Sequence, residues 1–392
     1  MSDYRNDLKR ILEKDVSSGR VAGNQLLVLR EGQELFYHEE GYADAEKRMG
    51  WAPDTICRLF SMSKPVTSAA VMILLERGML SLLDPVSRYL PEFADLKVLG
   101  ADGQVEACKR PMLISDLMNM TSGIPYPENW EGCSRSGILM DRMLSEVLPK
   151  IVAGEGPSTR EMAGRIAQVP LVFQPGERWM YGFGADVLGA LVEVVSGRRF
   201  GTFLKEEIFD RLQMPDTGFF VPEDKTDRFA MSYEYDAEGK LFPISDSHLG
   251  EYYKEDVRFE SGGAGLVSTI RDYSHFAQML AQGGIYSGQR ILGEATVRFM
   301  AQNRLKPEQM AGLDWDSNFG YGYGNLMRVL IDQGRAGISA PLGEFGWDGW
   351  TGNYVSMDPV NCLVILYFTQ LRGGDGSTEI MRRIKNVVYG SL

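Results

Sequence analysis

The sequence reads Ser61-Met62-Ser63-Lys64-Pro65 at the start of a long apolar stretch that continues to Arg77 and stops before Gly78. The pattern predicts a buried helix over residues 62–77, because apolar residues recur at nearly every turn and glycine is typical just past a helix end. Proline is tolerated only in the first turn, where backbone N–H groups have no helical partner. Ser61 is therefore expected at the helix N-terminus, where free N–H groups and the helix dipole stabilise an anion.

Ser61 and Lys64 are a candidate pair for nucleophilic catalysis. Residues three apart lie on one face of a helix, so the hydroxyl and the amine are within hydrogen-bond reach. Lys64 stands among apolar side chains, and desolvation lowers the pKa of a lysine until it accepts a proton near neutrality. Roughly one such S-x-x-K pair arises by chance in a chain of this size, so a helix cap with an exposed lysine is the alternative.

The rest of the chain predicts an α+β fold. Helices are expected over residues 3–18, 138–151, 158 onward, 187–195, 269–281 and 378–388, and strands over residues 24–29, 34–38, 319–329, 343–347, 352–357 and 362–369. Ser158 and Glu161 have the spacing of a capping box. Strands at both ends with helices between them imply one antiparallel sheet built from the two termini, with flanking helices. We expect an α/β lobe of residues 1–84 and 255–392, a mainly helical insertion lobe of residues 85–254, and the active site between them.

Composition limits the partners. The formal charge of −12 opposes binding to nucleic acid or an anionic membrane, so a small neutral or cationic partner is expected. The charged start of the chain has no signal-peptide pattern, and every apolar run is too short to span a bilayer, which predicts a cytoplasmic protein. The four cysteines are far apart and lack CxxC spacing, so we expect reduced, mostly buried thiols and no zinc site. The oligomeric state stays open.

Other catalytic patterns are missing. The sequence has no GxSxG, HExxH or P-loop motif, and its three histidines are His38, His248 and His275. His38 ends a predicted strand and His275 falls on a polar helix side, so both are expected in solvent, while His248 in a polar loop stays open. Ser245-Asp246-Ser247 has the wrong last residue for a serine-aspartate-asparagine motif and is interpreted as a loop. A Ser-His-Asp triad is thus poorly supported.

Five segments in register resemble one family. The nucleophile segment resembles that of class C β-lactamases, penicillin-binding proteins and family VIII carboxylesterases, and four further segments are similar to that family's motifs: Leu117-Met118-Asn119-Met120-Thr121-Ser122-Gly123, Pro175-Gly176-Glu177-Arg178-Trp179-Met180-Tyr181, Gly263-Ala264-Gly265-Leu266-Val267-Ser268-Thr269 and Gly346-Trp347-Asp348-Gly349. The resemblance implies a β-lactamase-like fold with Ser61 as nucleophile. It also implies that Tyr181 shares protons with Ser61 and Lys64, and that the backbones of Ser61 and Trp350 form the oxyanion hole.

The three proposed proton-transfer groups are expected to titrate as one coupled system. The Tyr181 phenol is a poor base unless the Lys64 cation holds it as a phenolate. The alternative is that Tyr181 is an aromatic residue packed on Trp179 at the start of a helix.

Departures from the family pattern narrow the range of expected substrates. Phe183, preceded by Gly182, stands where the family has asparagine, and Trp347-Asp348-Gly349 stands where penicillin-binding enzymes present a cation to a substrate carboxylate. Asp348 is expected to repel such an anion. Both changes resemble family VIII carboxylesterases more than β-lactamases, although Asp348 replaces their usual glycine.

The predicted pocket is aromatic and suits an apolar acyl or alcohol group. Its expected lining residues are Tyr126, Trp130, Trp179, Phe183, Trp347, Asp348, Gly349 and Trp350, with Met118 and Met120 nearby in the sequence. Ordinary core packing is the alternative for each of these aromatic residues.

The sequence therefore predicts a serine hydrolase that cleaves carboxylic esters through an acyl-enzyme intermediate, with no metal and no cofactor. Alternatives on the same scaffold are a weak β-lactamase, a D-amino-acid peptidase or amidase, and an acyltransferase. An alternative of a different class is a catalytically silent, penicillin-binding-like ligand sensor.

Overall fold

The computed structural model describes residues 3–100, 102–244, 257–373 and 376–392. His248, the segment Ser245-Asp246-Ser247 and the predicted lobe boundary near residue 254 lie outside these residues.

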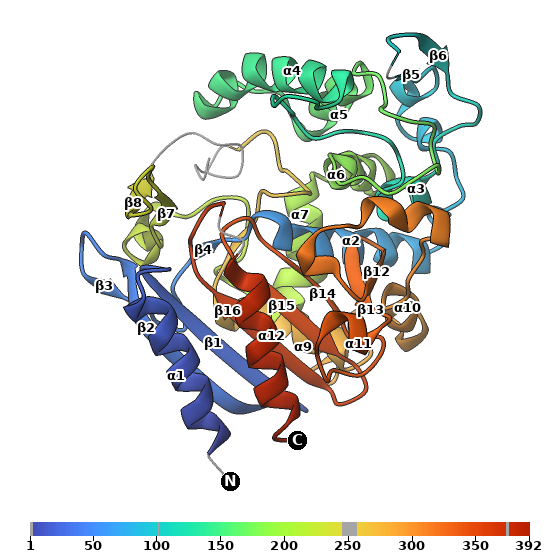
Figure 1. Ribbon diagram of the computed structural model, residues 1–392. Helices are drawn as coiled ribbons and strands as arrows, with labels where there is room; N and C mark the ends of the chain where they lie inside the picture. The colour runs from blue at the N-terminus through green and yellow to red at the C-terminus, as the bar shows by residue number, and fades with distance from the viewer. Residues whose placement is uncertain (1–2, 101, 245–256, 374–375) are drawn as a thin grey trace.

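Strands from the two ends of the chain form one eight-stranded antiparallel sheet, in the order β12-β13-β14-β15-β16-β1-β2-β3 (Figure 1). The bounds are β1 Gly23–Arg30, β2 Gln33–Asp44, β3 Met49–Gly50, β12 Tyr321–Gly324, β13 Met327–Leu330, β14 Phe345–Asp348, β15 Tyr354–Asp358 and β16 Leu363–Phe368. Strand β1 pairs with β16, with Leu27 opposite Leu366, and this pairing joins the two ends of the chain. The predicted α+β class and the sheet built from both termini are confirmed.

The prediction of a single strand over residues 319–329 is wrong. The structure has two strands there, β12 and β13, which pair with each other around Asn325 and Leu326. Both of these residues have positive φ, 52° and 63°. Asparagine tolerates this conformation, but leucine rarely adopts it, so Leu326 stands where glycine would usually mark the turn.

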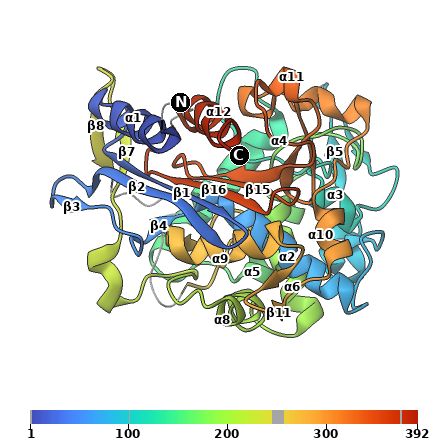
Figure 2. The ribbon, with the colours of Figure 1, turned by 90° about the horizontal axis from the view of Figure 1, so that it is seen from below.

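Helices cover both faces of the sheet (Figure 2). Helices α1 (Tyr4–Ser17) and α12 (Gly376–Tyr389) lie on one face, and α9 (Ile270–Ala281) and α2 (Ser63–Glu76) lie on the other. Successive side chains of β16 alternate between the two cores, with Ile365 beside the first helix pair and Leu366 in the core with α2 and α9. Burial on both faces explains why β16 is apolar at every position and β1 is continuously apolar over residues 26–29.

The remaining helices and four short two-stranded pairings complete the fold. The helices are α3 Ile114–Met118, α4 Arg135–Val152, α5 Thr159–Ala167, α6 Gly184–Ser196, α7 Phe200–Leu204, α8 Asp210–Leu212, α10 Glu294–Met300 and α11 Gln333–Ala336. The paired short strands are β4 Cys57–Arg58 with β9 Val267–Ser268, β5 Lys97–Leu99 with β6 Val105–Ala107, β7 Ser232–Tyr235 with β8 Leu241–Ile244, and β10 Ile285–Tyr286 with β11 Gln289–Arg290. The capping box of Ser158 and Glu161 is present at the start of α5. The division into two lobes at residues 84 and 254 stays a prediction.

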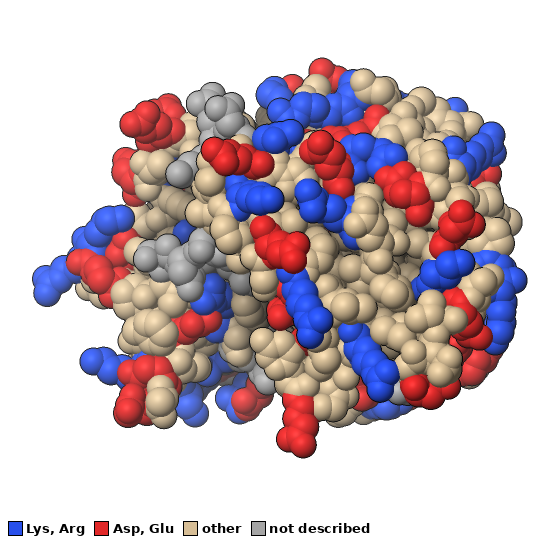
Figure 3. Space-filling model, turned by 90° about the horizontal axis from the view of Figure 1, so that it is seen from above, with Lys and Arg blue, Asp and Glu red and all other residues tan. Residues whose placement is uncertain are grey.

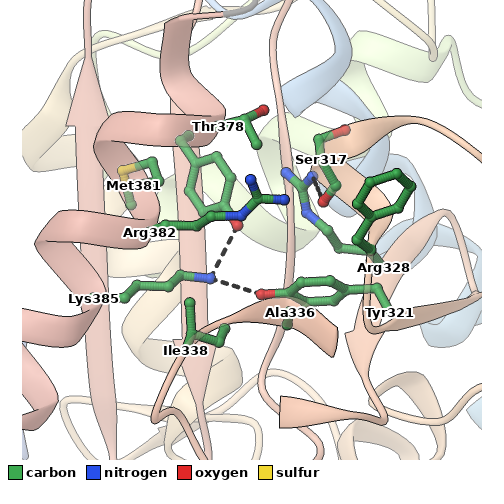
Figure 4. A pocket seen from close by; sticks show the side chains of 11 residues that line it. Ser317, Tyr321, Arg328, Ala336, Ile338, Thr378, Met381, Arg382 and Lys385 are labelled. Atoms are coloured by element: carbon green, nitrogen blue, oxygen red, sulfur yellow. Dashed lines mark hydrogen bonds between the residues drawn. The ribbon is translucent and has the colours of Figure 1, made fainter. Parts of the chain in front are cut away.

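A buried ion pair fixes α12 to the sheet. The Lys385 Nζ donates hydrogen bonds to the Glu344 carboxylate at 2.8 Å and to the phenol oxygens of Tyr321 and Tyr354 at 3.0 and 2.9 Å. Figure 4 shows the Lys385 ammonium directed at the Tyr321 hydroxyl. Although burial opposes both charges, each holds the pKa of its partner in the charged range, with Lys385 raised and Glu344 lowered. Removing either partner would leave a buried charge unpaired.

The surface and the thiols bear on the expected partners. Lysine and arginine are interspersed with aspartate and glutamate on the face that Figure 3 shows. Within the described residues, no helix is both long and apolar enough to cross a membrane.

All four cysteines are free, and only Cys57 is buried, so the expectation of mostly buried thiols holds for that residue alone.

Candidate active site

Ser61 lies in a single 3-10 turn, Phe60–Met62, that leads directly into α2. The predicted position at the helix start is correct, with the helix beginning at Ser63. Phe60 has a positive φ of 45°, a conformation that costs free energy in a bulky residue and is tolerated where surrounding structure enforces it. Two hydrogen bonds hold the end of the turn, because the Tyr273 hydroxyl donates to the Met62 carbonyl at 2.8 Å and the Leu266 N–H donates to the Ser63 hydroxyl at 3.0 Å.

Lys64 reaches Ser61 from the first turn of α2. Its Nζ donates hydrogen bonds to the Ser61 Oγ at 3.0 Å, the Tyr126 hydroxyl at 3.0 Å and the Gly263 carbonyl at 2.8 Å. The side chain is fully buried, and its Nζ also lies 4.6 Å from the centre of the Tyr181 ring. The exposed-lysine alternative is therefore excluded.

Burial lowers the pKa of Lys64 from 10.5 to about 7, and the negative charges of Asp186 and Asp348 oppose this shift only in part. A large fraction of Lys64 is then a neutral amine at neutral pH. A neutral amine 3.0 Å from a hydroxyl can accept its proton, which an ammonium cannot.

Tyr181 completes the cluster from the segment before α6. Its hydroxyl accepts a hydrogen bond from the Trp347 indole N–H at 2.9 Å and is hydrogen-bonded to Ser61. Burial raises the pKa of Tyr181, and its hydrogen bonds to Ser61 and Trp347 offset this only in part. The phenol is therefore neutral at physiological pH, so the condition under which it could act as a base, a phenolate held by the Lys64 cation, is not met. Lys64 is instead the group whose pKa suits a base.

Trp347→Phe is expected to lower kcat for an ester about tenfold with little change in KM, because it removes the donor that orients the Tyr181 hydroxyl while keeping most of the ring packing. Steady-state kinetics against p-nitrophenyl butyrate measure both constants. An unchanged kcat would show that the indole N–H does not position Tyr181. Trp179→Phe is the matched control, since the Trp179 indole nitrogen is buried without a hydrogen-bond partner in the described structure.

The segment after β14 lies against the serine. A side chain at Gly349 would come within 2.3 Å of the Leu59 carbonyl oxygen, so only glycine allows this close approach of the two backbones. The Trp350 ring meets the Phe60 ring edge-on at 5.5 Å between centres. The predicted oxyanion-hole residues, Ser61 and Trp350, thus belong to two segments that are packed together.

Asp348 is not an isolated negative charge. Its carboxylate forms an ion pair at 3.1 Å with Arg328, a side chain of β13 that is only 1% exposed. Burial opposes the arginine charge, but Asp348 raises the pKa of Arg328 overall. The expected repulsion of a substrate carboxylate by Asp348 is therefore weakened by an internal cation that the sequence pattern did not indicate.

Ser61 opens into a cavity of about 800 Å³. Its walls include the predicted residues Tyr126, Tyr181, Phe183, Trp347, Asp348, Gly349 and Trp350, and also Phe60, Pro127, Leu144, Asp186, Ser261, Ala264, Trp315, Asp316, Ser317, Gly373 and Thr378. Seven of the described lining residues are aromatic, and such surfaces take up apolar groups.

The structure places some of the predicted pocket residues elsewhere. Trp130 is 61% exposed and is not among the residues that line the cavity. Trp179, Met118 and Met120 are buried in the core. Sequence reasoning missed Trp315, which stacks edge-on against Tyr181 at 5.2 Å between ring centres and lies outside every motif.

Neither described histidine lines the cavity. His275 is half-buried, with its Nδ1 2.9 Å from the Leu212 carbonyl oxygen, so the expectation that it lies in solvent is only partly met. His38 lies near Glu13 and Glu40, and their possible ligand atoms are within 4.8 Å of one another. This group is partly exposed, and acidic residues often gather on surfaces without an ion.

Comparisons with known proteins agree with this architecture. The family model described as beta-lactamase matches residues 8–388. Protein Rv1367c of Mycobacterium tuberculosis is 33% identical over 90% of this chain and 86% of its own length, and esterase EstB of Burkholderia gladioli is 28% identical over 97% and 94%. The solved structure of EstCE1, described as a hydrolase with promiscuous acyltransferase activity, superimposes with a TM-score of 0.81 at 25% identity, covering 99% of this chain and 98% of that one. With the family model spanning almost its entire length, the chain belongs to the beta-lactamase family.

Proposed function

We propose that this protein is a serine hydrolase that cleaves carboxylic esters through an acyl-enzyme intermediate. The observation that carries the proposal is the hydrogen bond of 3.0 Å between the Ser61 hydroxyl and Lys64, whose pKa is about 7, at the wall of an aromatic cavity. The similarity to esterase EstB over nearly the whole chain supports the same activity class.

The proposed reaction has two steps. The neutral Lys64 amine accepts the proton of Ser61 while the Oγ attacks the ester carbonyl carbon, and the N–H groups of Ser61 and Trp350 stabilise the oxyanion. The neutral Tyr181 phenol donates a proton to the departing alkoxide and is reprotonated from the Lys64 ammonium. Water then attacks the acyl-enzyme by the reverse route, which releases the acid and restores Ser61.

The charges around the cavity favour a neutral ester over an anionic β-lactam. Among the described lining residues, the charged side chains are Asp186, Asp316 and Asp348, and none is lysine or arginine. The arginines that contact two of these carboxylates are already paired, since Arg328 binds Asp348 at 3.1 Å and Arg382 binds Asp316 at 3.1 Å. A substrate carboxylate would meet these negative side chains with no lysine or arginine among the described lining residues to bind it, which costs affinity.

Transfer of the acyl group to another alcohol is the second candidate. EstCE1 is described as combining hydrolase and acyltransferase activity, and the cavity of about 800 Å³ in this protein is large enough for an acceptor beside an acyl group. The peptidase, amidase and silent-sensor alternatives have no comparable support from the site.

The test compares substrates on purified protein. We expect p-nitrophenyl esters of graded acyl length to be hydrolysed at least about a hundredfold faster, in kcat/KM, than nitrocefin. Product analysis with an added acceptor alcohol separates hydrolysis from acyl transfer. Faster nitrocefin turnover would reject the esterase in favour of a β-lactamase, and a stable Ser61 adduct without turnover would favour a sensor.

A further inference from the structure

Asp186 is a buried carboxylate one step away from Lys64. It lies in the first turn of α6, where its Oδ1 accepts hydrogen bonds from the Ser261 hydroxyl at 2.5 Å and from the Gly263 N–H at 3.3 Å. The carbonyl of the same glycine accepts the hydrogen bond from the Lys64 Nζ at 2.8 Å. Asp186 is thus connected to the lysine through a single residue.

The turn at residues 261–264 has no room for a side chain at its two central positions, Gly262 and Gly263. A side chain at Gly262 would come within 2.3 Å of the Ala185 carbonyl oxygen, and one at Gly263 would come within 2.6 Å of the Asp186 Oδ2. The Thr67 hydroxyl of α2 holds the Gly262 carbonyl at 2.6 Å. The turn is therefore fixed from both helices, and its carbonyls point at α2.

We propose that Asp186 is a positioning residue for the reaction, which holds the Gly263 carbonyl against the Lys64 amine and sets the electrostatic field in which that amine exchanges its proton. The inference rests on the proposed function of Ser61 and Lys64. It assigns to Asp186 a role that none of the sequence motifs covers.

The electrostatic part of the proposed role follows because the Asp186 carboxylate accepts few hydrogen bonds. Its Oδ2 is buried and has no hydrogen-bond partner among the described residues. A charge that few donors neutralise acts strongly on its neighbours in a medium of low dielectric constant. Asp186 raises the pKa of Lys64 against the lowering effect of burial, and Lys64 in turn lowers the pKa of Asp186, which burial raises.

Other titratable or charged groups also face Lys64. Asp348 of β14 raises the pKa of Lys64 and is itself paired with Arg328, whereas Tyr126 and Tyr181 stay neutral because burial raises the pKa of each phenol. Asp186 is the stronger of the two anionic influences and has no arginine partner among the described residues. Removing its charge should therefore move the pKa of Lys64 further down.

The test is Asp186→Asn, which keeps an oxygen acceptor for Ser261 and Gly263 and removes the charge. We expect the acid limb of the pH profile of kcat/KM for p-nitrophenyl butyrate to move about one unit toward lower pH, with kcat on the plateau changed less than about threefold. Asp186→Ala also removes the acceptor, and kcat should then fall at least about tenfold at every pH.

Asp272→Asn is the matched control, because Asp272 is also a buried aspartate that accepts hydrogen bonds, from the Asp216 N–H and the Thr217 hydroxyl, but it does not line the cavity. The acid limb of the pH profile of kcat/KM should not move in Asp272→Asn. A purely structural role for Asp186 predicts lower stability in Asp186→Asn with an unmoved acid limb, and this result would overturn the proposal.

A readout without turnover separates this inference from the esterase itself. NMR titration of lysine ¹³Cε resonances, with Lys64 assigned by its loss in Lys64→Met, measures the pKa of Lys64 directly. A lower pKa in Asp186→Asn supports the coupling even if the wild-type protein hydrolyses no ester, in which case only the proposed function fails. An unchanged pKa rejects the coupling whatever the activity.

Discussion

Ser61→Ala is expected to reduce kcat/KM for p-nitrophenyl butyrate at least about a thousandfold, while the protein stays folded. The residual rate of a hydrolase without its nucleophile comes only from substrate binding and oxyanion stabilisation. Ser61 is half-buried at the cavity wall, and its hydroxyl is hydrogen-bonded to Lys64 and Tyr181, so loss of the hydroxyl removes two hydrogen bonds and little packing. The free energy of unfolding should change by less than about 2 kcal/mol.

The measurement pairs kinetics with covalent labelling. A fluorophosphonate should add one group to the wild-type protein, detected by intact mass, and none to Ser61→Ala. Ser68→Ala is the matched control on the same helix, because the Ser68 hydroxyl is buried and has no hydrogen-bond partner within the described structure. Its activity and labelling should equal those of the wild type. Ester hydrolysis by Ser61→Ala at more than a tenth of the wild-type rate would remove the serine from the mechanism.

The chemistry around Ser61 and Lys64 could be predicted because it depends on local rules. Pro65 requires a helix start, and three-residue spacing places the lysine beside the serine. The sheet from both termini followed from strands such as β1 and β16, whose apolar runs are typical of burial on both faces. These features need only neighbouring residues and their periodicity.

Features that depend on distant pairing could not be predicted in the same way. Arg328 and Asp348 meet across two strands of the sheet, and the pairing of Gly346 with Arg328 in that register sets their approach. Trp315 reaches the cavity from the position just before a 3-10 turn, Asp316–Asn318, that no motif marks. Trp130 was misplaced because an aromatic residue near a motif in sequence need not face the same cavity. The pKa of Tyr181 depends on how completely folding buries it, which sequence does not give.

Lys64→Met is expected to lower kcat/KM at least about a thousandfold. At neutral pH, the variant should nevertheless be more stable than a variant with an ordinary substitution in the core. The activity falls because methionine fills similar space but cannot accept the Ser61 proton. The stability effect follows from the ammonium, which loses hydration in a fully buried site. Methionine removes that cost and loses the hydrogen bond to the Gly263 carbonyl.

The lowered pKa of Lys64 also sets how the free energy of unfolding changes with pH. Because the pKa of Lys64 is about 7 when folded and 10.5 ordinarily, the unfolded chain binds a proton between these pH values that the folded chain does not. The free energy of unfolding of the wild type therefore rises with pH from about 7 to 10.5 through this group, and its full cost is present below pH 7. Lys64→Met has no such dependence, so its stability relative to the wild type should be greatest at pH 6 and should fall by a few kcal/mol toward pH 10.

Lys385→Met is the control, and its expected effect on stability is opposite in sign because Lys385 is a buried lysine that has an acidic partner. Lys385→Met leaves the Glu344 carboxylate unpaired, and we expect a loss of about 3–5 kcal/mol at neutral pH with kcat of the folded fraction unchanged. Urea unfolding of both variants and the wild type at pH 6, 8 and 10 measures the difference. If Lys64→Met and Lys385→Met lost equal stability at pH 6, Lys64 would be an ordinary paired lysine with a high pKa. It could then not serve as the base, because an ammonium beside Ser61 has no free electron pair with which to take the proton.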